Sequence, residues 1–430
     1  MALNLLYLLA AVLALPWVAW RRLSGGRPVA APWTRFTGGI TPPPPTRIPR
    51  IWLHGVSVGE VQLLAGLAAE LRRQTEAAGR PIDCVISSST TTGLEVAAKR
   101  FGTDRSFPCP LDFTWAVNRV LHRVRPDLVV LGELELWPNL LACSARRGIP
   151  IVVANARMSE RSARGYGRIA PLVRRMLGRV DAVVARSPDD AARFTALGAK
   201  HVVVAGSMKF DGVRGDREAP NVVRLRSLAG FREDATVFLA GSTQAPEERL
   251  ALEAFRAVEQ AHPRLRLVIV PRHVERAAEI AALLDDSGFR WQRRSRLDAE
   301  GADPAARILF VDTTGELSAW WGTAAIAFVG GSLDGKRGGQ NMLEPAAYGA
   351  AVCFGPHTRN FAREVEMLRT ADAACVVADG AALRKFVDRC LADPAWGRAL
   401  GARAAATVAA HRGATATTAR LILERLPNPP

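Results

Sequence analysis

The stretch HGVSVGE contains a single glutamate, Glu60, which follows an apolar run and precedes a long helix-like segment. A carboxylate at such a point, where the ligands of a parallel α/β sheet are expected to bind, can contact a substrate. An acidic residue in the first turn of a helix also complements the helix dipole. Glu60 therefore has both a functional and a structural interpretation. Gly55 and Gly59 beside it permit a tight turn or the close approach of a substrate.

Polar and glycine residues also follow the apolar runs of the second half. The densest stretch, from Phe328 to Phe361, contains Glu344, an acceptor-only carboxylate that can bind the vicinal hydroxyls of a ribose. Arg272 in PRH can pair with a phosphate, or it is a surface charge. Ser242 in GSTQAPEE and Gly315 in DTTGEL precede expected helix starts, where free N–H groups bind anions.

These residues indicate a nucleotide site of a restricted kind. The chain has no GxxxxGK[ST] pattern, which excludes a P-loop, and no GxGxxG follows the first apolar run. A sugar nucleotide fits better than a dinucleotide cofactor.

The elements that must position these residues form a parallel α/β pattern. Apolar runs such as IWLH, DCVISSS and DLVVLGE alternate with helix-like segments, pause around residues 211–228, and resume with ATVFLAGST and LRLVIVPRH. This pattern predicts two doubly wound halves in tandem, covering residues 51–215 and 216–430. Ligands are expected at the carboxyl ends of the strands and in a cleft between the halves.

The first 50 residues differ from the rest. Residues 5–20 carry no charge and precede Arg21, Arg22 and Arg27, which predicts a membrane anchor or membrane-surface helix over residues 1–22, with the remainder on the cytoplasmic side. A buried core helix is the alternative. Residues 23–50 are rich in Pro, Gly and Arg and should form a stiff, extended spacer.

The overall charge favours anionic partners. Lys and Arg outnumber Asp and Glu by 57 to 41, for a net charge of +16. The three tyrosines, and the lack of basic stretches interleaved with aromatics, argue against a nucleic-acid stacking surface. The six cysteines are scattered without metal-ligand spacing, so no metal site is expected and the thiols should be reduced.

Seven motifs occur in order along the chain: HGVSVGE, GELELWPNL, NARMSERS, PRH, DTTGEL, GGSL followed by GGQNMLEPAAYG, and GPHTRNF. Together they resemble the 3-deoxy-D-manno-octulosonic acid (Kdo) transferases of lipopolysaccharide assembly. The resemblance implies a GT-B fold, with an N-terminal acceptor domain and a C-terminal domain for the donor CMP-Kdo. It also implies the lipid A precursor (lipid IVA) as acceptor, at the cytoplasmic face of the inner membrane.

The resemblance assigns roles residue by residue. Glu60 matches the proton acceptor, and the nucleotide contacts fall on Pro271, Arg272, Gly315, Glu316, Leu317, Asn341, Met342, Leu343 and Glu344. Ser242 is a further candidate for the phosphate. Gln340 and Met342 depart from the family's usual His and Pro, which affects local nucleotide geometry only. No cofactor or metal is implied. The alternative is another GT-B enzyme that uses a UDP-sugar, an N-acetylglucosaminyl transferase or a sugar-nucleotide epimerase.

Overall fold

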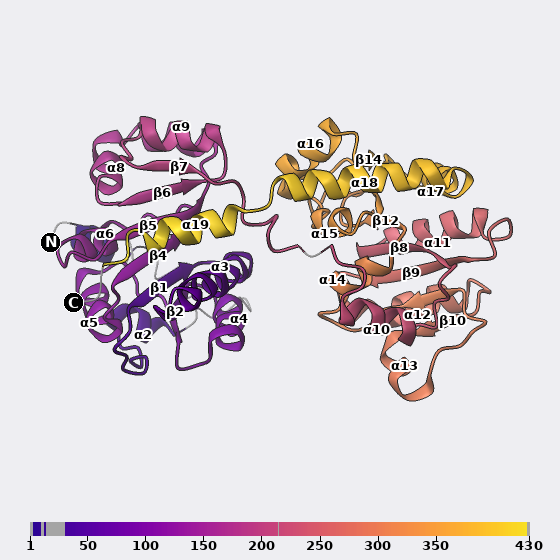
Figure 1. Ribbon diagram of the computed structural model, residues 1–430, viewed down its shortest axis with the longest axis horizontal. Helices are drawn as coiled ribbons and strands as arrows, with labels where there is room; N and C mark the ends of the chain where they lie inside the picture. Colours follow the sequence, from indigo (N-terminus) through magenta and orange to yellow (C-terminus); the bar gives the residue numbers. More distant parts are fainter. Residues whose placement is uncertain (1–2, 10–12, 14–30, 214, 428–430) are drawn as a thin grey trace. The chain divides into compact units, whose positions relative to one another are not determined.

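The computed structural model describes residues 3–9, 13, 31–213 and 215–427 of the 430-residue chain. It forms two compact units, one from Met1–Gly212 with Arg412–Pro430 and one from Val213–His411. In each unit, helices surround a parallel seven-stranded sheet (Figure 1). The α/β, doubly wound prediction is confirmed.

The sheet of the first unit has the strand order β3-β2-β1-β4-β5-β6-β7. Its strands are β1 (Arg50–Gly55), β2 (Asp83–Ser88), β3 (Ser106–Pro108), β4 (Leu128–Gly132), β5 (Ile151–Ala156), β6 (Ala182–Ala185) and β7 (Val202–Val204). Side chains alternate between the two faces, so Trp52 enters one core cluster while Ile51 and Leu53 enter another. Both faces are buried, which explains why these strands read as continuous apolar runs.

Helices complete the first unit. They are α2 (Pro32–Thr37), α3 (Val58–Ala77), α4 (Thr91–Phe101), α5 (Thr114–Val124), α6 (Pro138–Ala145), α7 (Glu160–Gly167), α8 (Ala170–Leu177), α9 (Pro188–Ala196) and α19 (Ala414–Leu423).

The sheet of the second unit has the order β10-β11-β9-β8-β12-β13-β14. Its strands are β8 (Thr236–Thr243), β9 (Leu265–Pro271), β10 (Trp291–Arg293), β11 (Ile308–Phe310), β12 (Ile326–Val329), β13 (Ala351–Phe354) and β14 (Cys375–Val376). The α-helices are α10 (Pro220–Leu228), α11 (Glu247–Val258), α12 (Ala277–Asp285), α13 (Arg294–Glu300), α14 (Leu317–Trp320), α15 (Leu343–Ala347), α16 (Ala362–Thr370), α17 (Gly380–Ala392) and α18 (Pro394–Ala410). Short 3₁₀ turns occur at η1 (Val274–Arg276), η2 (Trp321–Thr323) and η3 (Arg359–Phe361).

The end of the chain lies in a different unit from the one expected. Residues 216–430 were predicted to form one domain, but α19 packs against α3 in the first unit. Ala419 and Ile422 of α19 are fully buried in the same core cluster as Leu67 and Leu71 of α3. The carboxylate of Asp211 accepts hydrogen bonds from the N–H groups of Gly413 and Thr415, both at 2.6 Å, where the chain re-enters the unit. Apolar burial, which sequence order does not reveal, determines this placement.

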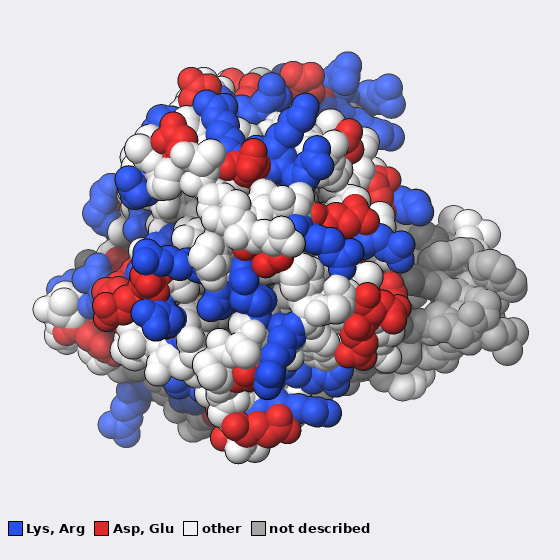
Figure 2. Space-filling view, turned by 90° about the vertical axis from the view of Figure 1, so that its right-hand side faces the viewer, with Lys and Arg blue, Asp and Glu red and all other residues white. Residues whose placement is uncertain are grey.

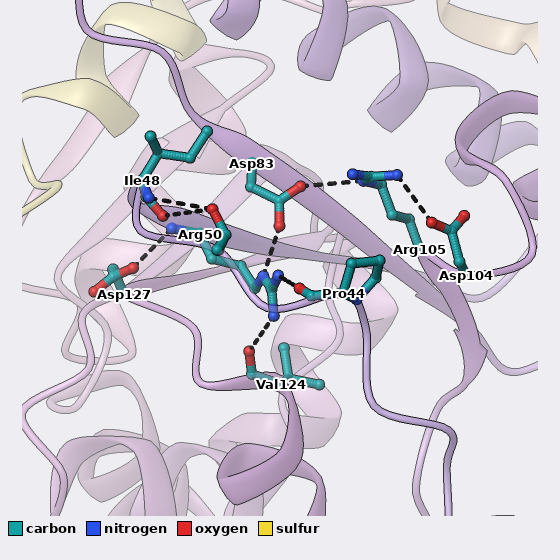
Figure 3. A network of polar contacts seen from close by, with 9 residues as sticks. Pro44, Ile48, Arg50, Asp83, Asp104, Arg105, Val124 and Asp127 are labelled. Atoms are coloured by element: carbon teal, nitrogen blue, oxygen red, sulfur yellow. Dashed lines mark hydrogen bonds and ion pairs between the residues drawn. The ribbon is translucent and has the colours of Figure 1, made fainter.

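The described part of the expected spacer is folded onto the first unit. Ile40 is 2% exposed in the core. The buried Arg50 guanidinium pairs with Asp83 at 2.7 Å and donates to the Val124 carbonyl at 2.9 Å and to that of Pro44 (Figure 3). These bonds hold the proline-rich segment against the sheet, so the stiff-spacer interpretation does not describe residues 31–50. Residues 23–30 lie outside the described residues.

Part of the expected membrane segment is described. Residues 3–9 are helical, and the Tyr7 hydroxyl donates to Asp112 at 3.2 Å, so this piece is attached to the first unit. Leu5, Leu6, Leu9 and Leu13 are each more than half exposed. Residues 10–12 and 14–22 lie outside the description. Within the described residues, no helix has both the length and the apolar character needed to cross a bilayer.

Candidate active site

Glu60 lies in the first turn of α3, directly after the carboxyl end of β1. Its Oε2 accepts the N–H of Val56 at 2.9 Å, and its Oε1 accepts the Ser57 hydroxyl at 2.8 Å. The Ser57 oxygen in turn accepts the N–H of Glu60 at 3.3 Å and caps the helix. This pattern is close to a capping box, so the structural interpretation of Glu60 applies. The half-exposed carboxylate keeps lone pairs for a further donor.

Gly55 allows Glu60 to pack this closely. A β-carbon at position 55 would lie 3.1 Å from the Glu60 Cβ and 3.0 Å from a Leu64 methyl group. At Gly59 an added β-carbon would make only an ordinary contact at 3.9 Å. Of the two glycines singled out by the motif, the first is therefore the one that local packing requires.

β1 and β4 are neighbours at the point where the strand order reverses, and this brings further carboxylates near Glu60. A β-carbon on Gly132, the last residue of β4, would lie 3.7 Å from Glu60 Oε2. Burial raises the pKa of Glu135 to about 7, and the charge of Glu60 acts in the same direction. Glu133 pairs with the buried Arg186. The reversal point of an open α/β sheet is where ligands bind, and here it is acidic.

His54 belongs to the same motif but lies in the core. It is fully buried, and its Nδ1 is 2.9 Å from the Ser87 hydroxyl. Burial lowers the pKa of His54 to about 4, so the ring is neutral at physiological pH. The buried ring therefore packs in the core of the first unit and bonds to β2.

In the second unit the strand order reverses between β8 and β12, and the residues proposed for nucleotide binding follow the carboxyl ends of the strands in this sheet. Ser242 lies near the end of β8 with φ 55° and is 8% exposed. Glu133 and Asn155 at the carboxyl ends of strands in the first unit have similar φ values, 56° and 54°. Such conformations are strained for non-glycine residues and concentrate at functional sites.

The glycine-rich loop after β12 is held by a carboxylate that sequence reasoning missed. Glu247, which is 2% exposed at the start of α11, accepts four backbone N–H groups. Their distances are 2.9 Å for Gln244, 2.7 Å for Gly331, 3.0 Å for Ser332 and 3.2 Å for Leu333. Burial raises the pKa of Glu247 while the four N–H groups oppose the shift. These N–H groups are therefore already occupied and are not free for a phosphate.

A second set of bonds fixes the outer part of the loop. Arg359 donates to the carbonyls of Gly335 and Lys336, each at 2.8 Å. The Asn360 amide donates to the Arg337 carbonyl at 2.8 Å. The GPHTRNF motif thus supports the loop, and contact with substrate is not needed to explain Arg359 and Asn360.

The residues proposed for nucleotide binding differ in which of their groups are available to a ligand. Arg272 is exposed after β9, and within the described part of the chain its guanidinium has no partner. The Glu316 carboxylate forms a two-pronged pair with Arg294 at 2.8 and 2.7 Å, so only its backbone is available. Gly315 precedes α14 with φ 87°, and Pro271 is buried at the end of β9.

Residues 341–344 also differ from one another in exposure and in hydrogen bonding. Asn341 donates to the Glu344 carboxylate at 2.9 Å, and Glu344 remains partly exposed. Burial raises the pKa of Glu344. Met342 and Leu343 are 0% and 1% exposed, so their side chains lie in the interior of the unit. Leu317 of the DTTGEL motif is the first residue of α14 and is half-buried.

Comparison with known proteins identifies the family of this chain. Residues 33–212 match the family model described as 3-deoxy-D-manno-octulosonic-acid transferase (kdotransferase). The 3-deoxy-D-manno-octulosonic acid transferase of Bordetella pertussis is 33% identical over 412 residues, which cover 94% of this chain and 93% of that protein. The chain belongs to the Kdo transferase family. The Kdo transferase of Haemophilus influenzae is 34% identical over an alignment that covers 77% of this chain and 76% of that protein.

Solved structures support the fold. The UDP-GlcNAc 2-epimerase of Neisseria meningitidis, bound to UDP-GlcNAc, has a TM-score of 0.56 at 12% identity, over 88% of this chain and 99% of that protein. A second UDP-N-acetylglucosamine 2-epimerase, from Listeria monocytogenes, has a TM-score of 0.54 at 13% identity, over 87% of this chain and 95% of its own. These two likenesses show a fold of the GT-B type, and the transferase activity follows from the family to which the chain belongs.

Proposed function

We propose that the protein transfers Kdo from CMP-Kdo to a sugar hydroxyl of the lipid A precursor, with Glu60 as the general base. Membership of the Kdo transferase family carries the reaction class. The position of Glu60 at the reversal point of the first sheet, with both carboxylate oxygens held by hydrogen bonds, supports its role. The two bonds orient the carboxylate while leaving lone pairs to accept a proton.

The reaction requires two groups from the protein, a base for the attacking hydroxyl and a cation for the phosphate of the leaving group. A base must remove the proton from the attacking hydroxyl as the new bond to the anomeric carbon forms, and this is the role of Glu60. The leaving group is CMP, whose phosphate gains negative charge as its bond to the sugar breaks. Arg272, an exposed guanidinium without a partner among the described residues, is suited to bind this phosphate.

The second unit binds the donor in this proposal. Glu344 accepts the ribose hydroxyls, and its bond from Asn341 fixes its orientation. Gly315, Glu316, Leu317, Met342 and Leu343 contribute backbone groups, and Pro271 and Ser242 shape the strand ends. A CMP-sugar has no diphosphate that requires a divalent ion. We therefore expect turnover to persist in EDTA; activity lost in EDTA and restored by magnesium would contradict this.

The acceptor is anionic and lipidic, and features of the first unit suit it. Arg157 and Arg161 are exposed near the start of α7 and can meet acceptor phosphates. Exposed Leu5, Leu6 and Leu9 give the N-terminal helix an apolar face for the membrane surface. We place the enzyme at the cytoplasmic side of the inner membrane.

The decisive experiment compares wild type with Glu60→Gln for Kdo transfer from freshly generated CMP-Kdo to the lipid A precursor, with products resolved by mass. Glu95→Gln, on the exposed face of α4, is the matched control. We expect Glu60→Gln to lose at least a hundredfold in kcat while CMP affinity, measured by calorimetry, is unchanged. An equally active Glu60→Gln enzyme would remove Glu60 as base, and a wild type that prefers UDP to CMP would remove the donor assignment.

A further inference from the structure

The second unit contains a cavity of about 600 Å³ at the amino edge of its sheet. Its wall includes Thr236 and Leu265 at the starts of β8 and β9, and Ile326 and Ala351 at the starts of β12 and β13. The proposed donor residues all follow the opposite, carboxyl edge. A strand of eight residues such as β8 spans roughly 25 Å, so the cavity is separate from the donor site.

Basic groups line the cavity, and no carboxylate does. Arg217, His262, Arg264 and Arg398 are the ionisable nitrogen groups in its wall. Arg398 is exposed on the first turns of α18 and has no partner among the described residues. Arg264 pairs with Asp234 at 3.3 Å, but this aspartate also pairs with Arg232 at 3.1 Å. Positive charge therefore exceeds negative charge at this edge of the sheet.

Arg217 strengthens this imbalance. Its guanidinium donates to three carbonyl oxygens, those of Tyr348 at 2.8 Å, Gly322 at 2.9 Å and Ala324 at 2.6 Å. No carboxylate of the described chain pairs with it. Burial lowers the pKa of Arg217, and the charge of Arg226 adds to the effect. A cation taken out of water without a counter-ion is costly, and a bound anion would offset that cost.

Apolar residues share the wall with the basic groups. Ala261, Pro263, Leu391 and Pro394 are at least partly exposed, whereas Leu265, Ile326 and Ala351 are almost fully buried. The volume falls within the range of small-molecule sites, roughly 300–1,000 Å³. We propose that this cavity binds a small amphipathic anion, one carboxylate on an aliphatic chain, with the carboxylate against Arg264 and Arg398 and the chain against Pro263 and Leu391.

Decanoate is a suitable probe, with decanol as its uncharged counterpart. Titration calorimetry on the full chain, in one detergent buffer so that partition into micelles is common to all samples, should show saturable binding of one decanoate. Decanol should bind at least tenfold more weakly. The Arg264→Ala, Arg398→Ala double variant should lose at least tenfold in decanoate affinity, whereas exposed Arg249→Ala, outside the cavity, should change nothing.

A steric variant tests the location independently of charge. Gly397 lines the cavity from α18, and a β-carbon there would only touch Cys390 at 3.7 Å. Gly397→Leu therefore keeps the helix, whose propensity it improves, and fills the cavity. It should abolish decanoate binding with an unchanged circular dichroism spectrum. No saturable binding to wild type, equal binding of decanol, or wild-type affinity in the double and Gly397→Leu variants would each overturn the proposal. Kdo transfer is not the readout, so this outcome is independent of the proposed reaction.

Discussion

At the scale of single residues, Glu60 combines two interpretations that its sequence position left open. The capping contacts with Ser57 and Val56 are those of a structural helix-start residue. The same contacts fix the direction of the carboxylate, which a base requires. Glu60 and Glu135 each belong to a motif that is visible in the sequence, but their proximity results from the pairing of β1 with β4.

Glu135 should make stability depend on pH. Burial, and then Glu60, raise its pKa from 4.5 to about 7. Between these pH values the folded chain holds a proton that the unfolded chain has released, so the free energy of unfolding falls as pH rises through this window. Glu135→Gln should therefore raise the Tm relative to wild type more at pH 8 than at pH 5 in thermal denaturation. Exposed Glu95→Gln is the control, and an equal Tm difference at both pH values would contradict the expectation.

Arg272 allows a test of donor binding. Its free guanidinium forms charge-assisted bonds with the phosphate in the proposed complex, and such bonds are worth about 1.5–3 kcal/mol each. Arg272→Ala should weaken CMP binding by roughly ten- to a hundredfold in calorimetry, with an unchanged Tm because the side chain is exposed. Arg249→Ala is the matched control. CMP affinity equal to that of wild type would remove Arg272 from the nucleotide site.

At the scale of elements, the sequence predicted the strands but did not predict where residues 31–50 and α19 pack. Runs such as DCVISSS became buried strands because parallel strands covered on both faces are apolar throughout. The attachment of residues 31–50 depends on Arg50, whose partners at 83 and 124 are distant in sequence. The location of α19 depends on its packing against α3, which precedes it by more than 300 residues in the sequence. Glu247 was missed because its neighbours gave only a weak signal for helix-end anion binding.

The packing of α19 on α3 predicts a measurable stability effect. Ile422 is fully buried in the core cluster that includes Leu67 and Leu71. Ile422→Ala should lower the free energy of unfolding of the first unit by about 2–5 kcal/mol, through lost burial and a residual cavity. Hydrogen exchange of the α3 amides, followed by mass spectrometry, should accelerate accordingly. Exposed Arg420→Ala on the same helix should have little effect, and unchanged α3 protection in Ile422→Ala would contradict the expected packing role.

At the scale of the whole molecule, Lys and Arg outnumber Asp and Glu, which gives a net charge of +16. Basic and acidic side chains are interspersed on the face drawn in Figure 2. Many arginines of the described chain pair with carboxylates, such as Arg276 with Glu248 at 2.7 Å. Screening by salt weakens the attraction of such a surface to anionic lipid. Apolar contacts from the N-terminal helix do not respond to salt in this way.

Membrane binding should therefore have two separable parts. Cosedimentation with anionic vesicles should decrease in high salt without vanishing, since basic residues near the surface contribute about 1 kcal/mol each. Leu6→Gln with Leu9→Gln, both exposed in wild type, should remove the salt-resistant part. Thr417→Gln on α19 serves as a control elsewhere in the first unit. Complete release of the wild type by salt would contradict an apolar contribution.

The return of α19 also has a consequence for synthesis on the ribosome. The helix that carries Glu60 is made early, but the side of α3 that packs on α19 stays uncovered until residues 414–423 have emerged. At roughly 5–20 residues per second, the intervening 199 residues of the second unit, Val213–His411, take about 10–40 s to translate. During this time the nascent first unit exposes the apolar side of α3, which α19 covers only after it has been synthesised. Chaperone contact during elongation should concentrate on that surface, and a chain that stops before residue 414 leaves Glu60 on a helix that lacks its packing partner α19.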